Sequence, residues 1–133
     1  MNTTIMRTGG LFLGVLVWAL LGASFSYAAT LTLSPSSGTH ADGEIFSVDI
    51  LLDTQGQAVD AVDIDALNYD TTLLSVVDED SGTSGVQISP GTLFGSTNFN
   101  VVNTSSGAIQ FSQATGSGTK FTGAGTPATV QFQ

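Results

Sequence analysis

Three aspartates in the middle of the chain are the residues whose type and spacing could do chemistry. They are Asp60, Asp63 and Asp65, and they lie in segment 58–77 (AVDAVDIDALNYDTTLLSVV), where acidic and apolar residues alternate. Because successive side chains of a β-strand point to opposite faces, the alternation predicts a carboxylate row on one face and apolar side chains on the other. Exposed carboxylates could accept charge-assisted hydrogen bonds from Lys or Arg of a partner. Alternatively, they only keep an exposed strand face polar and discourage edge pairing.

The alternation in this segment changes phase. Val62 and Ile64 share one parity, whereas Leu67 and Tyr69 share the other. A strand can bury both pairs only if an extra residue is inserted between them. We therefore predict a β-bulge near residues 65–66.

The chain has few of the residues that catalysis requires. It contains one histidine, His40, and no cysteine, which excludes most nucleophile–base pairs. Alternating aspartates meet the carboxylate spacing of glycosidases, about 5–9 Å, by accident of strand geometry. The acidic run at 78–80 (DED) lacks the spaced oxygen ligands and distant glutamate of an EF-hand calcium loop. We expect a solvated loop there, no metal, no cofactor and no enzymatic activity.

The first 28 residues have the layout of a secretory signal peptide. Arg7 supplies the positive region, residues 11–21 (LFLGVLVWALL) form the apolar region, and Ser26-Tyr27-Ala28 provides a cleavage site with small residues. The uncharged apolar run is shorter than the roughly 20 residues that span a bilayer. We expect cleavage after Ala28 or Ala29, no remaining membrane span, and a secreted protein that is extracellular or attached to the cell surface.

Removing this leader leaves a strongly acidic single domain at residues 29–133. Because Arg7 leaves with the leader, the formal charge changes from −9 to −10, and Lys120 stays as the sole strong base. Such a surface repels phosphate groups, so nucleic-acid binding is excluded. A cationic protein surface, a divalent cation or a neutral polymer remain as partner classes. The absence of cysteine means that a core, not disulfides, must stabilise this exported domain.

The fold class follows from short alternating strands separated by Gly- and Asn-containing turns. This pattern predicts an all-β sandwich of two antiparallel sheets. A sharp corner at Tyr69-Asp70 separates the long central strand from a short one. We expect four phenylalanines in the core, namely Phe46, Phe99, Phe111 and Phe132. Two others, Phe94 and Phe121, are expected in exposed loops. The expected strands are 30–33, 44–52, 58–69, 73–77, 86–88, 99–102, 108–111 and 129–132.

Several segments in this order resemble the cohesin family, whose modules bind dockerin modules on scaffold proteins. They are FSVDILL, AVDIDALNYDTTLLSVV, SPGTLF, FNVVNTSSGAIQFSQA, FTGAG and TPATVQF, from Leu31 to Phe132. The most characteristic part is the corner Tyr69-Asp70, followed by leucine and two valines. The resemblance implies a jelly-roll or immunoglobulin-like β-sandwich of nine strands. It also implies a non-catalytic scaffold module that docks a dockerin-type partner through its acidic face, the partner carrying its own calcium.

The chain departs from the family pattern in two places. In the family another strand follows the TVQF segment, so the resemblance implies that the last strand is missing here. Well-known cohesins carry an Asn-x-Asp pair for dockerin contact before the corner. Those positions hold Val62 and Ile64 here, or Ala61 and Asp63 if the bulge is allowed for.

Two other functions stay open. Direct binding of polysaccharide would require exposed aromatic rings that stack on sugars, for which only Phe94 and Phe121 are available in loops. A structural module of a cell-surface layer or filament would use an unpaired sheet edge to accept a strand from a neighbour.

Overall fold

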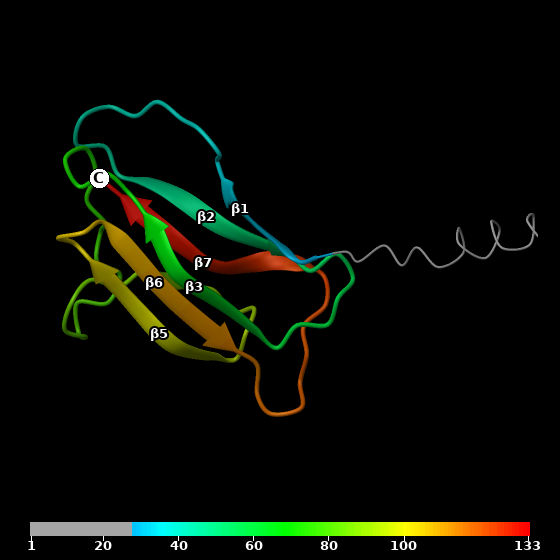
Figure 1. Ribbon diagram of the computed structural model, residues 1–133. Helices are drawn as coiled ribbons and strands as arrows, with labels where there is room; N and C mark the ends of the chain where they lie inside the picture. The colour runs from blue at the N-terminus through cyan, green and yellow to red at the C-terminus, as the bar shows by residue number, and fades with distance from the viewer. Residues whose placement is uncertain (1–27) are drawn as a thin grey trace, which may run out of the picture.

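The computed structural model describes residues 28–133, so the predicted signal peptide, apart from Ala28, lies outside the described residues. Within this range the chain forms two antiparallel sheets packed face to face, which confirms the predicted β-sandwich (Figure 1). One sheet has four strands in the order β1-β2-β7-β4, and the other has three in the order β3-β6-β5. The strands are β1 (Thr30–Ser34), β2 (Phe46–Asp53), β3 (Ala61–Asn68), β4 (Ser89–Pro90), β5 (Ser96–Asn103), β6 (Ala108–Ala114) and β7 (Ala124–Phe132).

The core is one apolar layer between the sheets, built from the inward-facing positions of alternating strands. In β6 the buried residues Ile109, Phe111 and Gln113 alternate with the more exposed Gln110 and Ser112. The opposite sheet contributes residues of the same kind from β2 and β7, as period-two alternation requires. The largest fully buried apolar side chains are Phe111, Ile50, Ile88, Ile109 and Val130.

The predicted bulge in β3 is confirmed. The pairing of β3 with β6 shifts register between Ile64 and Leu67, at the predicted position. The shift inserts an unpaired residue, so Val62 is buried and Leu67, of opposite parity, still packs against the core. A similar shift between Thr97 and Phe99 changes the phase of β5.

One side of the sandwich is closed by the chain that crosses between the sheets before β5. The Asn100 side chain accepts a hydrogen bond from the Ile88 backbone N–H at 3.0 Å and donates one to the Ile88 carbonyl at 2.7 Å. Val86 forms an isolated antiparallel bridge with Val102. The strand predicted at 86–88 was therefore wrong in detail, because the regular pairing of β4 with β7 begins only at Ser89.

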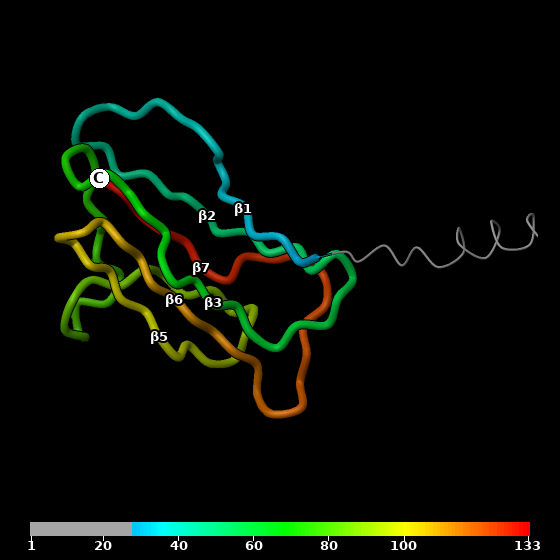
Figure 2. Tube along the Cα trace, in the orientation of Figure 1, coloured from blue at the N-terminus to red at the C-terminus, as the bar shows by residue number. Residues whose placement is uncertain are grey.

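The opposite side of the sandwich is bordered by two strands with unpaired outer edges. Among residues 28–133, β1 pairs only with β2, and β3 pairs only with β6 (Figure 2). The short strand predicted after the Tyr69-Asp70 corner is reduced to a turn and an isolated bridge between Val76 and Phe132.

The closed side yields a test of stability. Asn100→Ala removes both bonds to Ile88 and leaves its partly buried backbone groups unsatisfied, so we expect a loss of about 1–3 kcal/mol in the free energy of unfolding. Asn98→Ala, at an exposed position of the same strand, should cost less than about 0.5 kcal/mol. Urea denaturation measures both values, and equal losses would contradict the closure by Asn100.

Candidate functional site

The candidate site is the outer face of the three-stranded sheet, which cross-strand pairing brings together. Ser112 in β6 lies opposite both Asp63 in β3 and Phe99 in β5. Val101 in β5 lies opposite Gln110 in the next row. All three strands send these side chains away from the core, so polar, acidic and apolar groups share one surface. The name outer face is used below for Asp63, Asp65, Gln110, Ser112, Phe99 and Val101.

Phe99 and Val101 make this face partly apolar. The fractional exposure of their side chains is 48% and 39%. The expectation that Phe99 belongs to the core was wrong, because the register shift between Thr97 and Phe99 points it outward, while Val102 is buried. An exposed phenylalanine beside an exposed valine is the type of feature that anchors a protein partner.

The two phenylalanines expected in exposed loops lie elsewhere. Phe94 is only 3% exposed, so that expectation was wrong for it. Phe121 is half-buried and packs edge-on against Phe94, with ring centroids 5.8 Å apart. Their glycine-rich surroundings hid this pairing, which depends on two loops meeting in space.

The three predicted aspartates do not form a single row. Asp63 and Asp65 lie two residues apart in β3, and both are exposed. Asp60 precedes the strand, and its Oδ2 lies 3.1 Å from Nζ of Lys120. Lys120 is the only lysine or arginine among residues 28–133. The described part of the chain therefore has no such base left for Asp63 and Asp65, which are available to a cationic partner.

The Lys120 ammonium also changes the titration of its partner. Its hydrogen bond, and then its charge, hold the pKa of the Asp60 carboxyl below the ordinary value. A lowered pKa in the folded state means that this pair adds stability above the ordinary pKa of aspartate and loses that contribution as the pH falls through the lowered value. Both side chains are well exposed, so solvent screening keeps the contribution small.

The predicted corner at Tyr69-Asp70 is a structural element. Asp70 Oδ1 accepts hydrogen bonds from Thr72, from its backbone N–H at 2.9 Å and its hydroxyl at 2.6 Å, and these bonds lower the pKa of Asp70. The Tyr69 ring packs edge-on against Phe132 at 5.6 Å, and burial raises the pKa of its hydroxyl. The corner thus orients the end of β3 and holds Tyr69 against β7.

The acidic loop uses its carboxylates for internal turns. Asp78 Oδ1 accepts the backbone N–H of Gln87 at 3.1 Å, and Asp80 accepts the N–H of Gly82 and the hydroxyl of Thr83. Among residues 28–133, no three His, Asp or Glu side chains are grouped so that they could hold a metal ion.

Comparison with models of protein families, with curated proteins and with solved structures found no match to this chain. Within the described range, the structure has no helix long and apolar enough to cross a membrane.

The ion pair gives a prediction for titration. Replacing the base with Lys120→Gln should raise the pKa of Asp60 towards its ordinary value, because the hydrogen bond and the charge that lower it are both changed. The pKa of Asp70 should stay lowered, because its cause is Thr72. Carboxyl carbon shifts followed by NMR from pH 2 to 6 (about two units either side of the ordinary aspartate value) measure both. An unchanged Asp60 titration would contradict the pairing.

The corner gives a prediction for stability. Gly107 has φ +69°, it accepts the backbone N–H of Tyr69, and a Cβ added to it would overlap the Tyr69 carbonyl oxygen. Gly107→Ala should therefore destabilise the fold by about 2 kcal/mol or more. Gly116→Ala has open space around the added Cβ and should cost less than about 1 kcal/mol. Thermal unfolding compares the two, and a harmless Gly107→Ala would show that the corner does not require this close approach.

Proposed function

We propose that this protein is a non-catalytic binding module that docks a protein partner on its outer face. The observation that carries the proposal is the pair Phe99 and Val101, exposed at 48% and 39%, in one sheet with the carboxylates of Asp63 and Asp65. An exposed apolar pair that shares a face with carboxylates that are not paired with a lysine or arginine has the composition of a docking surface. In such a surface the apolar part supplies affinity and the charges supply orientation.

The chemistry of the face defines the partner. The apolar pair would accept an aliphatic or aromatic side chain, and a Lys or Arg of the partner would reach Asp63 or Asp65. A guanidinium would form the stronger contact, because it can donate two hydrogen bonds to one carboxylate. Attraction between a basic partner and a domain of formal charge −10 would also raise the association rate at low salt.

The resemblance to cohesins gives this partner a class. A cohesin-like module would take a dockerin-type partner, with calcium carried by the partner. The confirmed β-sandwich supports this proposal, as does the position of Asp63 on the strand before the Tyr69-Asp70 corner. In this proposal the module is secreted and acts outside the cell or at its surface.

Direct binding of polysaccharide is the second candidate, and exposed Phe99 is the observation that favours it. A single ring offers one stacking contact, whereas a flat polysaccharide is held by several coplanar rings. In residues 28–133 the other aromatic side chains are buried or half-buried. Tyr69 packs edge-on against Phe132 and so does not extend a platform with Phe99. The protein partner is therefore the better-supported proposal.

Binding to a panel of calcium-loaded dockerins by calorimetry tests the proposal. We expect Phe99→Ser to weaken binding about 10- to 100-fold, because truncating a central aromatic anchor at an interface costs roughly 1.5–3 kcal/mol of binding free energy. Asp63→Asn should weaken it about tenfold and reduce its salt dependence. Asp42→Asn makes the same charge change at an exposed loop position outside the outer face and should leave binding unchanged.

Two results would contradict this account. Equal effects of Asp63→Asn and Asp42→Asn would show that net charge, not the outer face, drives association. Retention on insoluble cellulose that is lost in Phe99→Ser, without binding to any dockerin, would replace the protein partner with a polysaccharide.

A further inference from the structure

The two sheets differ in width, and the difference uncovers one strand. In β1, Leu31 pairs with Leu52 and Leu33 pairs with Ile50, both buried residues of β2. Pairs directly opposite each other in neighbouring strands share a face of the sheet, so these leucines point towards the interior. Even so, their side chains are 44% and 41% exposed. In the part of the chain that the structure describes, the three-stranded sheet ends at β3 and offers no strand to cover them.

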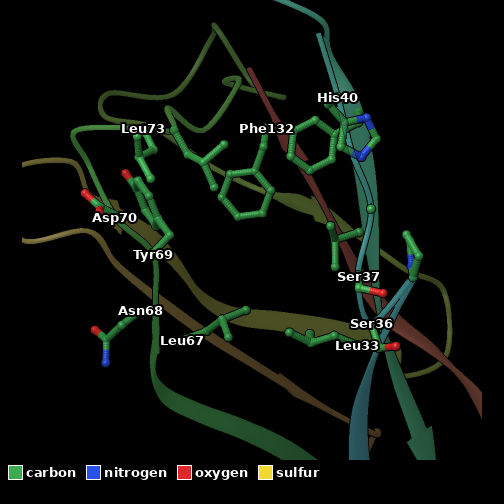
Figure 3. A pocket seen from close by; sticks show the side chains of 15 residues that line it. Leu33, Ser36, Ser37, His40, Leu67, Asn68, Tyr69, Asp70, Leu73 and Phe132 are labelled. Atoms are coloured by element: carbon green, nitrogen blue, oxygen red, sulfur yellow. The ribbon is translucent and has the colours of Figure 1, made fainter. Parts of the chain in front are cut away.

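A cleft runs along this side of the sandwich. Its larger part has a volume of about 540 Å³, with apolar side chains from β1, β2, β7 and the end of β3 (Figure 3). Figure 3 shows the side chains of Leu33 and Leu67 pointing toward each other, with Tyr69 and Phe132 further along the cleft. A second part of about 250 Å³ continues between Leu31 and Ile64. The cleft therefore runs along β1 and β3, in the direction that an added strand would take.

The β3 border of the cleft offers unpaired backbone groups. Within the described residues β3 pairs with β6 on one edge only, so its other edge presents N–H and C=O groups that no described strand pairs with. The opposite side of the sandwich differs, because there Asn100 and Val102 contact the crossing chain. The open side thus combines a backbone edge with an apolar cleft beside it.

From this arrangement we propose that the open side is a strand-acceptor site. An extended segment of another polypeptide pairs with the free edge of β3 and becomes the fourth strand of that sheet. Neighbouring strands lie about 4.8 Å apart and packed sheets about 10 Å apart, so the added strand lies opposite β1. Its alternate side chains then cover Leu31 and Leu33.

The chemistry of the occupant follows from the two faces of the added strand. Side chains that point inward meet Leu31, Leu33 and Leu67 and must be apolar. Side chains that point outward lie in the rows of Asp63 and Asp65, where opposite charges on directly neighbouring strands are favourable. The site therefore takes a strand that alternates apolar residues with Lys or Arg.

A second copy of this chain does not meet these requirements. Its formal charge of −10 without the leader would repel an identical domain. Lys120, the only lysine or arginine in residues 28–133, is already paired with Asp60. The strand-acceptor site shares Asp63 and Asp65 with the proposed function. It differs in its other contacts, because it uses the β3 edge and the cleft, whereas dockerin binding uses Phe99 and Val101.

Synthetic seven-residue peptides test the proposal on protein purified from cells that express the full chain. The probe alternates valine with lysine, and its controls replace each lysine with glutamate or the central valine with proline. We expect saturable binding of the lysine peptide, at least tenfold weaker binding of the glutamate peptide, and none of the proline peptide, which lacks a required backbone donor. Amide NMR shifts should change in residues 61–68 and 30–34.

Two variants locate the contact. Leu33→Asp places a charge in the cleft and should weaken the peptide at least tenfold. If that variant fails to fold, the double change Asp63→Asn and Asp65→Asn should abolish the preference for lysine over glutamate. Phe99→Ser should leave peptide binding unchanged while it weakens dockerin binding, so the two proposals fail separately.

Three results would overturn the proposal. They are absence of saturable binding by the lysine peptide, shifts confined to Phe99 and Val101, and a dimer of the chain that Leu33→Asp dissociates. The last result would make a second copy the occupant.

Discussion

The phase of side-chain alternation in each strand is the constraint on which the rest of this structure depends. One apolar layer must be buried between two sheets, so each strand has to present its apolar residues to the same side along its length. Where the sequence changes parity, the backbone inserts a residue. The shift in β3 keeps both Val62 and Leu67 against the core. The shift in β5 has a different consequence, because it directs Phe99 away from the core.

This constraint explains which features the sequence could predict. The β3 bulge was predictable because Val62, Ile64, Leu67 and Tyr69 are all apolar, so both parities demanded burial. The segment around Phe99 is ambiguous, since FNVV offers an apolar residue in either phase. Only the pairing with β6 and the contact of Asn100 with Ile88 decide that Val102 is buried and Phe99 is not.

The candidate site was predictable in part for similar physical reasons. The exposure of Asp63 and Asp65 follows from local alternation, which sequence contains. The pairing of Asp60 with Lys120 joins residues 60 positions apart, and the cleft depends on the unequal widths of two sheets. Both are long-range properties that no local pattern encodes. The same holds for Phe94 and Phe121, which contact each other only because two loops meet.

Charge and burial divide the surface into regions with different roles. Acidic groups at the Asp70 corner and the 78–80 loop are used for hydrogen bonds that fix turns, and Asp60 is paired with the single lysine of the described part. Asp63 and Asp65 remain without such a partner, and on the outer face they lie between its apolar pair, Phe99 and Val101, and the open edge of β3. A basic polypeptide could therefore meet the same carboxylates from either direction.

Amide hydrogen exchange along β3 tests most directly the claim that the sandwich is closed on one side and open on the other. In an edge strand every second N–H points away from its neighbour. We therefore expect alternating fast and slow exchange across residues 61–68, and slow exchange at the paired amides of β6 and β7, which have neighbours on both sides. Uniform slow exchange along β3 would mean that its outer edge is already covered, and would contradict the account.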